Sequence, residues 1–389
     1  MIKILKTGEA NSRELFERTT STTDVTQVVK QIIDTVKERG GSALLELTEK
    51  LDHVVIHDVK VSDDEINDAL METDPDFLSI LYEAADNIRQ FHKNQLRPGF
   101  IMSEKPGVIM GQRVMPIEKV GLYVPGGTAP LPSTVLMSAI PAKLAGCSEI
   151  VMTTPVQKDG KIMPEMLAAA KIAGVNKIFK VGGAQAIAAL AYGTESVPKV
   201  DKIVGPGNQY VAEAKRQVFG TVAIDMIAGP SEILIIADKT ANPVYLAADL
   251  LSQAEHDKLA TAVLITDDKE LAEKTAACLE SQLELLPRRE IAAASIERNG
   301  KIIIADNLLE AVKISNELAP EHLELCVENP FDMMSLIKNA GSIFLGNTLP
   351  SRLATTFQAQ TTPFRPVVQR VFQARSRSMT LLKKPSLHI

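Results

Sequence analysis

This chain of 389 residues has few cysteines, no long apolar run and no acidic residue near its C-terminal end. The first two features each exclude a class of protein. The three cysteines, Cys147, Cys278 and Cys326, fit neither a disulfide framework nor the paired spacing of a metal site, which favours a reducing compartment. No run approaches the roughly 20 apolar residues of a membrane span, so we expect a cytoplasmic protein with no membrane partner. The formal net charge of -6 argues against a general nucleic-acid binder.

The first hundred residues are polar and helical in pattern. A helix is expected to begin at Thr23-Asp24 and to end at Gly40-Gly41, and further helices are expected over 42–51 and 76–92. We find no group of catalytic side chains here.

From Lys119 onward, short apolar runs alternate with helical segments, which is typical of a parallel α/β protein. The expected strands are 120–124, 149–153, 177–181, 202–204, 222–225, 233–237, 262–266, 301–304 and 342–345. The sequence therefore predicts an α/β fold with two Rossmann-like units and additional N-terminal helices. We expect an N-terminal segment of residues 1–22, a first domain of 23–122 plus 233–346, a second domain of 123–232, and a disordered tail of 347–389.

Glycine-rich loops follow three of the expected strands, at 125–134, 182–185 and 205–208. Ligands bind at the carboxyl ends of strands in open α/β sheets, and glycines let a backbone approach a phosphate closely. None of the loops has the G-x-G-x-x-G spacing. A nucleotide site and tight turns needed only for packing therefore both remain open at this point.

Two further pairs of side chains could carry chemistry. Gln253 and His256 are three residues apart on an expected helix, where they could bind a divalent ion from one face, or simply satisfy nearby carbonyls at a polar helix end. Glu321 and His322 follow a turn, as two separate bases or as the first turn of a helix.

Six longer motifs in one order resemble those of the histidinol dehydrogenase family; they lie at 123–137, 181–194, 204–211, 225–232, 252–256 and 319–323. The resemblance extends to about Gly346. It implies a homodimeric zinc enzyme that oxidises L-histidinol through histidinal to L-histidine in two NAD-dependent steps, the last reaction of histidine biosynthesis.

The resemblance also assigns roles to single residues. It implies NAD contacts at Tyr123, Gln185 and Asn208, catalytic bases at Glu321 and His322, and zinc ligands at Gln253 and His256. Substrate contacts are implied at Ser231, Gln253, His256 and His322. His322 would take the hydroxyl proton in the first step, and Glu321 would deprotonate the water that attacks the aldehyde.

The chain departs from the family at about Asn347. The family's third zinc ligand, an Asp, would fall near Thr355, and its fourth has no counterpart. No acidic residue follows Asp332, while arginine and lysine accumulate. The basic residues could form a nucleic-acid-binding tail, but no nucleic-acid-binding module accompanies them. A frame change with truncation explains the departure better, because restoring one base after the Gly346 codon can yield Lys-Tyr-Thr-Pro-Glu.

We therefore expect impaired activity in this form. Two alternatives stay open: a non-catalytic remnant that still binds nucleotide, and a zinc hydrolase that uses Glu321 as its base.

Overall fold

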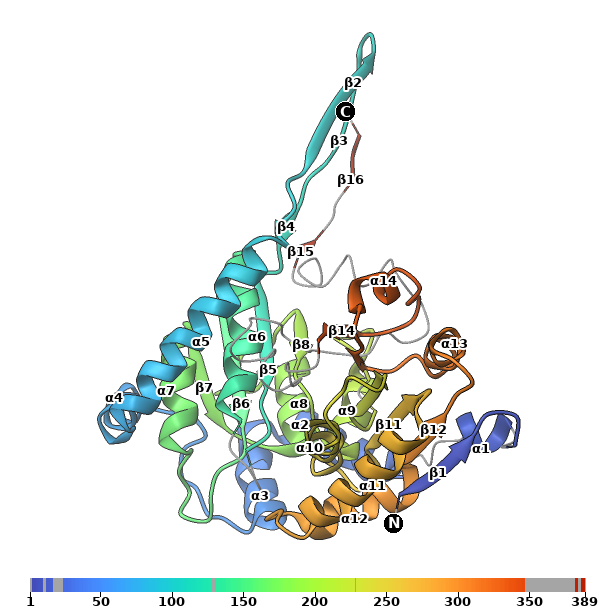
Figure 1. Cartoon of the computed structure of the whole chain (residues 1–389). Coiled ribbons are helices and arrows are strands. Elements are labelled where there is room, and N and C mark those ends of the chain that lie inside the picture. The colour runs from blue at the N-terminus through green and yellow to red at the C-terminus, as the bar shows by residue number, and fades with distance from the viewer. Residues whose placement is uncertain are drawn as a thin grey trace. The chain divides into compact units, whose positions relative to one another are not determined.

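The structure, a computed structural model, describes residues 2–9, 12–16, 24–126, 131–227, 229–346, 382–383 and 386–388 (Figure 1). Its contacts divide the chain into two compact units. We call Asp24–Ala228 the central unit, and Met1–Thr23 with Gly229–Thr355 the terminal unit. The expected α/β class is confirmed, since the large sheets of both units are parallel and covered by helices.

The central unit is built on a five-stranded parallel sheet in the order β7-β6-β5-β8-β9. Its strands are β5 (Lys119–Tyr123), β6 (Glu149–Thr154), β7 (Lys177–Lys180), β8 (Lys202–Val204) and β9 (Ala223–Ile224). The connecting helices are α6 (Pro132–Ala145), α7 (Pro164–Ala173), α8 (Gly183–Tyr192) and α9 (Gln209–Val218). The strand order reverses between β5 and β8, which is the place where open α/β sheets bind ligands.

The N-terminal helices add an outer layer to each face of this sheet. Helices α2 (Thr26–Arg39) and α3 (Gly41–Asp52) share one apolar core with α8 and α9. Helices α4 (Asp63–Glu72) and α5 (Pro75–Lys93) share a second core with α6 and α7.

The expected grouping of residues 23–122 with 233–346 is therefore corrected, because the apolar faces of these helices are buried within the central unit. Sequence periodicity shows that a helix has an apolar face but does not show which sheet that face covers.

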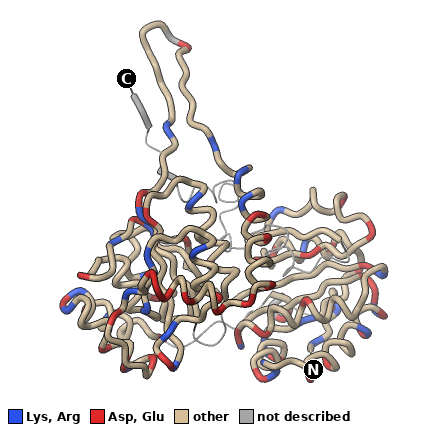
Figure 2. The backbone as a smooth tube through the Cα atoms, turned by 90° about the vertical axis from the view of Figure 1, so that its left-hand side faces the viewer, with Lys and Arg blue, Asp and Glu red and all other residues tan. Residues whose placement is uncertain are grey.

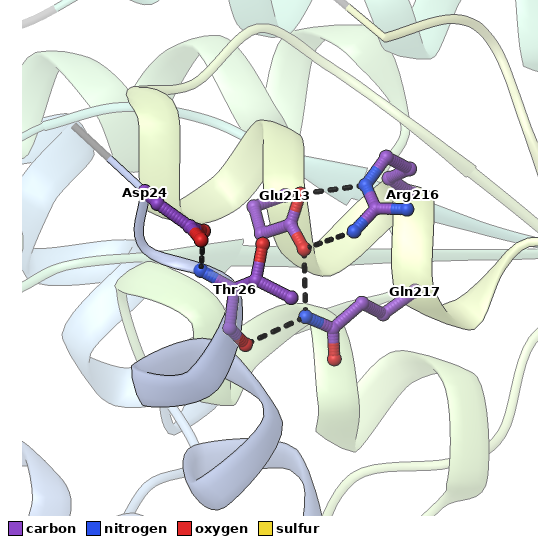
Figure 3. A network of polar contacts seen from close by, with 5 residues as sticks. All are labelled: Asp24, Thr26, Glu213, Arg216 and Gln217. Atoms are coloured by element: carbon purple, nitrogen blue, oxygen red, sulfur yellow. Dashed lines mark hydrogen bonds and ion pairs between the residues drawn. The ribbon is translucent and has the colours of Figure 1, made fainter. Parts of the chain in front are cut away.

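A polar network ties the start of α2 to α9 (Figure 3). Glu213 accepts hydrogen bonds from Arg216, at 2.6 and 2.7 Å, and from Gln217, at 2.7 Å. The Nε2 amide of Gln217 also donates to the carbonyl oxygen of Thr26, at 2.9 Å. The hydrogen bonds from Arg216 are the main cause that holds the pKa of the Glu213 carboxyl below its usual value. The network fixes the helix whose first turn follows Asn208.

The terminal unit has a six-stranded parallel sheet in the order β1-β12-β11-β10-β13-β14. Its strands are β1 (Lys3–Lys6), β10 (Glu232–Ala237), β11 (Thr261–Thr266), β12 (Lys301–Ile304), β13 (His322–Cys326) and β14 (Ser342–Leu345). Helices α10 (Pro243–Ala254), α11 (Lys269–Leu283) and α12 (Arg289–Asn299) share a core with one face. Helices α1 (Ser12–Phe16), α13 (Leu308–Leu318) and α14 (Pro330–Met334) lie on the other.

Apart from β1, both sheets follow one order: the first strand lies in the middle, the next two are added on one side, and the last two on the other. Strand β13 was not among the expected strands. Its presence corrects the alternative that Glu321 begins a helix, because this residue lies in the bend that leads into β13. Ala319, in the left-handed region at φ 48°, ends α13 and starts that bend.

A hairpin of β2 (Phe100–Lys105) and β3 (Val108–Gln112) extends from the rest of the central unit (Figure 1). Two short strands of the C-terminal segment also belong to this unit: β15 (Leu382–Lys383) pairs with β4 (Met115–Pro116), and β16 (Ser386–His388) pairs with β3. The rest of the tail, Thr355 included, lies outside the described residues, and so does the disorder expected there.

Basic and acidic residues are interspersed along the described backbone (Figure 2). In the part of the chain that the structure describes, no helix is both long and apolar enough to span a membrane.

Candidate active site

Glu321 and His322 of the terminal unit lie side by side at the start of β13. The carboxylate Oε2 of Glu321 is 3.6 Å from Nδ1 of His322, and it accepts a hydrogen bond of 3.3 Å from the backbone N–H of Glu232. Adjacent side chains diverge only within a regular element. Because Glu321 lies in a bend, both groups face the same small region. The Glu321 side chain is 18% exposed and that of His322 is 7% exposed, so the pair is shielded but reachable.

The tautomer of His322 follows from its backbone partner. Nδ1 lies 3.0 Å from the carbonyl oxygen of Glu232. A carbonyl oxygen can only accept, so Nδ1 carries a proton, and in the neutral ring Nε2 then has the lone pair. The ring of His322 also stacks on Phe344 of β14, with centroids 6.1 Å apart and planes at 13°. His322 is thus held in one tautomer and one orientation, with Nε2 as its basic atom.

Gln253 reaches this group from the last turn of α10. Its buried side-chain amide lies 3.2 Å from Nδ1 of His322, measured to the amide nitrogen. A protonated Nδ1 has no lone pair for an N–H donor, and amide oxygen and nitrogen are told apart only by their partners. The contacts therefore assign the amide oxygen of Gln253 to the side that faces His322.

The sequence suggested that Gln253 and His256 share one helix face, but the structure places only Gln253 in the helix. Helix α10 ends at Ala254, and His256 lies in the following turn, where it is exposed. Its backbone N–H donates to the carbonyl oxygen of Gln253 at 3.1 Å. Periodicity located the helix correctly but not the residue at which it ends, because helix ends depend on local capping and packing.

This group lies at the amino ends of strands. Ser231, Glu232 and His322 are at the starts of β10 and β13, whereas open α/β sheets usually bind ligands at the carboxyl ends. Ser231 directly precedes β10, and its carbonyl oxygen accepts from Thr261 at 3.0 Å. Helix α10 leaves the carboxyl end of β10 and runs back along the sheet, as a right-handed crossover does, so its last turn returns to the amino edge. This return places Gln253 beside His322.

The described residues do not form a complete zinc site. They contain no group of three or more His, Cys, Asp or Glu side chains placed to hold a metal ion. Of the implied ligands, they contain only Gln253 and His256, and the amide oxygen of the first faces His322. A protein zinc site usually has four ligands, or three with a water. The site at Thr355 lies outside the described residues.

The residues predicted to bind the nucleotide lie at the carboxyl ends of strands in the sheet of the central unit. The phenol oxygen of Tyr123, at the end of β5, accepts a hydrogen bond of 3.2 Å from the N–H of Gly183, the first residue of α8. Gln185 is buried in the same turn. A Cβ on Gly183 would lie 2.7 Å from Oε1 of Gln185, so both predicted side chains meet at this glycine. Burial raises the pKa of Tyr123 to about 12, so the phenol stays protonated.

Asn208 caps α9, the helix that follows β8. Its side-chain oxygen accepts from the N–H groups of Tyr210 at 3.0 Å and Val211 at 3.2 Å. The capping engages the oxygen, so a ligand would be bound through the amide nitrogen. Gly205 brings this loop against Tyr123: a Cβ at Gly205 would lie 2.0 Å from the Tyr123 carbonyl oxygen. The strand reversal thus brings the ends of β5 and β8 together.

Comparison with known proteins identifies the family. The histidinol dehydrogenase family model matches residues 16–360. The chain is 54% identical to histidinol dehydrogenase of Streptococcus mutans over 335 residues, 86% of this chain and 78% of that protein. It is 55% identical to the Listeria monocytogenes enzyme over 347 residues, 89% of this chain and 81% of that protein. The crystal structure of histidinol dehydrogenase from Elizabethkingia anophelis matches with a TM-score of 0.92 at 37% identity, covering 100% of this chain and 90% of that one. The chain belongs to the histidinol dehydrogenase family.

Membership confirms the family that the motifs predicted. Histidinol dehydrogenases are NAD-dependent oxidoreductases of histidine biosynthesis, and histidinol is their substrate. The residue roles, zinc and the homodimer remain predictions for this chain. The family model ends at residue 360, beyond the point at which the sequence motifs stop.

Sequence reasoning missed the contacts of Glu232 with Glu321 and His322. Its carbonyl oxygen and N–H group contact His322 and Glu321. The motif Gly229–Pro230–Ser231–Glu232 leads directly into β10, and Glu321-His322 leads into β13. Neighbouring parallel strands begin at the same edge of a sheet, so the two motifs could have been predicted to meet. The sequence pattern did not indicate this, because β13 was not among the expected strands.

Proposed function

We propose that this chain oxidises L-histidinol with His322 and Glu321 as its two bases. The observation that carries the proposal is the contact of His322 Nδ1 with the Glu232 carbonyl, which leaves Nε2 as the basic atom. In the first step, Nε2 takes the proton of the primary hydroxyl while the carbinol carbon loses a hydride, and histidinal forms. NAD supplies the hydride acceptor when bound.

The second oxidation needs a water molecule. Glu321 takes a proton as that water adds to the aldehyde carbon, and the hydrate loses a second hydride to give the carboxylate of histidine. The N–H of Glu232 orients the Glu321 carboxylate by donating to one of its oxygens. Ser231, Gln253, His256 and His322 are the proposed substrate contacts, and all belong to the terminal unit. The partial burial of the bases limits the access of bulk water to the aldehyde.

The carboxyl edge of the central sheet fits the proposed NAD contacts. Among the described residues, Oε1 of Gln185 is buried and has no hydrogen-bond partner. A buried acceptor without a partner is costly, which a donor on a bound nucleotide would relieve. A Cβ would also clash at Gly126, 2.8 Å from Thr154 Oγ1, and at Gly205, so glycine lets the loops after β5 and β8 pack closely against their neighbours. Tyr123, Gln185 and Asn208 would hold the nucleotide.

Zinc is the least supported part of the proposal. Two neutral ligands, Gln253 and His256, hold a divalent ion weakly in water. We propose that zinc binds poorly to the 389-residue chain. A frame change near the Gly346 codon would account for the departure from the family's third zinc ligand near Thr355. The homodimer implied by the resemblance is likewise proposed, and sedimentation equilibrium would test it.

A non-catalytic remnant that retains nucleotide binding is the second candidate. It is favoured by the incomplete zinc site and by the intact side chains at the carboxyl edge of the central sheet. NADH formation from histidinol, followed by absorbance in the 389-residue chain and in a frame-corrected chain, separates the two. Activity in both chains, lower in the first, supports the dehydrogenase. NAD binding without any NADH formation in the first would support the remnant, and no activity in either would overturn the proposed function.

A further inference from the structure

A buried ion pair of the central unit lies beside residues 205–208, which we call the 205–208 loop. Lys215 of α9 and Asp225, which follows β9, are in ionic contact, and their side chains are 2% and 5% exposed. Nζ of Lys215 also donates to the carbonyl oxygen of Gly205 at 3.0 Å, and Oδ2 of Asp225 accepts from the Gly205 N–H at 2.8 Å. The pair therefore holds the peptide groups on both sides of Gly205.

The 205–208 loop restricts its own conformation only in part. Pro206 fixes its own φ and Asn208 is held by its capping bonds to α9, but Gly205 and Gly207 have no side chain that restricts the backbone. A larger residue does not fit at either glycine, since Gly205 has φ +127° and lies against the Tyr123 carbonyl, and a Cβ on Gly207 would lie 2.4 Å from the Val211 side chain. The conformation at Gly205 therefore depends on contacts from outside the loop.

The cost of the ion pair also points to a positioning role. Removing two charges from water is expensive, and apolar residues of similar size often stabilise a fold as well or better. Here both charges form additional hydrogen bonds to the Gly205 peptide groups, and Asp225 also accepts from the N–H of Met226 at 2.6 Å. The pair thus has every feature of a clamp on one backbone position.

We propose that Lys215 and Asp225 are positioning residues for nucleotide binding, which clamp Gly205 so that Asn208 and Tyr123 keep one arrangement at the carboxyl edge of the central sheet. The proposal rests on the proposed binding of NAD by Tyr123, Gln185 and Asn208. The pair acts through the backbone of the 205–208 loop and does not itself contact the nucleotide.

The test uses a double variant, Lys215→Met with Asp225→Asn, which removes both charges of the pair together. The control is Lys301→Met, which removes a buried ammonium group from β12 of the terminal unit and leaves the Gly205 clamp in place. A second double variant, Lys215→Gln with Asp225→Asn, is neutral but retains a polar donor near Gly205. Two measurements are made on the full chain: amide hydrogen exchange of residues 203–210, with residues 149–154 as the internal reference, and NAD affinity by titration calorimetry.

In the Met–Asn variant, we expect amide exchange in the 205–208 loop to be about tenfold faster while the reference strand is unchanged, since the bond from Lys215 is lost and the bond to residue 225 is no longer charge-assisted. The NAD dissociation constant should rise by about tenfold for the same reason. The Gln–Asn variant should fall between this variant and the parent, and Lys301→Met should resemble the parent in both measurements.

Unchanged loop exchange, or unchanged NAD affinity, in the Met–Asn variant would overturn the proposal. Equal acceleration of exchange in the loop and the reference strand would also overturn it, because that result indicates a general loss of stability. If the Met–Asn variant does not fold, parent-like loop exchange or NAD affinity in the Gln–Asn variant overturns it. If the parent chain binds no NAD, the proposed function fails and the nucleotide role falls with it, while the exchange data still report on the clamp.

Discussion

Nδ1 of His322 lies 3.0 Å from the carbonyl oxygen of Glu232, although 90 positions separate the two residues in the chain. This contact fixes which imidazole nitrogen is basic, because a carbonyl can only accept a hydrogen bond. The same backbone residue orients the Glu321 carboxylate through its N–H group. The backbone of one residue at the start of β10, Glu232, thus positions both proposed bases.

The two bases should differ in the step that they serve. In a frame-corrected chain, Glu321→Gln should slow oxidation of histidinal more than oxidation of histidinol to the aldehyde, by about 100-fold or more, because only the former needs a base for water. Single-turnover NADH formation from each substrate measures the two steps separately. Equal rates on histidinal in variant and parent would exclude this role for Glu321.

Metal retention should depend on His256. In the frame-corrected chain, His256→Ala should lower zinc content and histidinol oxidation together, since the loss of one of few ligands weakens metal binding by about tenfold or more. Elemental analysis after dialysis gives the zinc content. His53→Ala is a suitable control, because His53 ends α3 in the central unit and has no proposed ligand role. Full zinc content in the His256 variant would rule out this ligand.

Restoring the family reading frame beyond Gly346 should raise both zinc content and turnover. The expected gain in kcat/KM is about 100-fold, which corresponds to placing a substrate properly at the reacting centre. Parallel assays of zinc and NADH formation on the two chains test this. Near-normal turnover by the 389-residue chain would contradict the proposal that its C-terminal segment impairs the site.

Lys202 should make the stability of the central unit depend on pH. Burial lowers the pKa of its ammonium group from 10.5 to about 8. The unfolded chain therefore binds more protons between these two values, and the free energy of unfolding should rise as the pH increases through this window. Between pH 8 and 9.5 the contribution of Lys202 is about 2 kcal/mol.

Chemical denaturation of the parent and of Lys202→Met at several pH values isolates this contribution. Burial raises the pKa of Cys147 to about 11 and that of Tyr123 to about 12, which lowers stability at high pH in both proteins equally. The difference between variant and parent should therefore shrink by about 2 kcal/mol over the window. Parallel pH curves for the two proteins would show that Lys202 is not the cause.

Sequence alone determined the features that depend on local pattern. Short apolar runs followed by helical segments predicted most strands of both sheets, because buried parallel strands and amphipathic helices each have a characteristic period. The motifs around Gly182, Gly205 and Glu321 identified the family and its NAD-dependent chemistry. They also identified the candidate site residues by position, without showing which of them would be in contact.

Only the tertiary structure decided which of these residues meet. The return of α10 to the amino edge of the terminal sheet places Gln253 beside His322, and the pairing of β10 with β13 places Glu232 between the two bases. The sequence also did not predict that Lys215 and Asp225 clamp Gly205. Nor did it predict that the N-terminal helices are buried in the central unit. Each depends on how distant segments pack, and side-chain periodicity reports only which face of an element is buried and not what buries it.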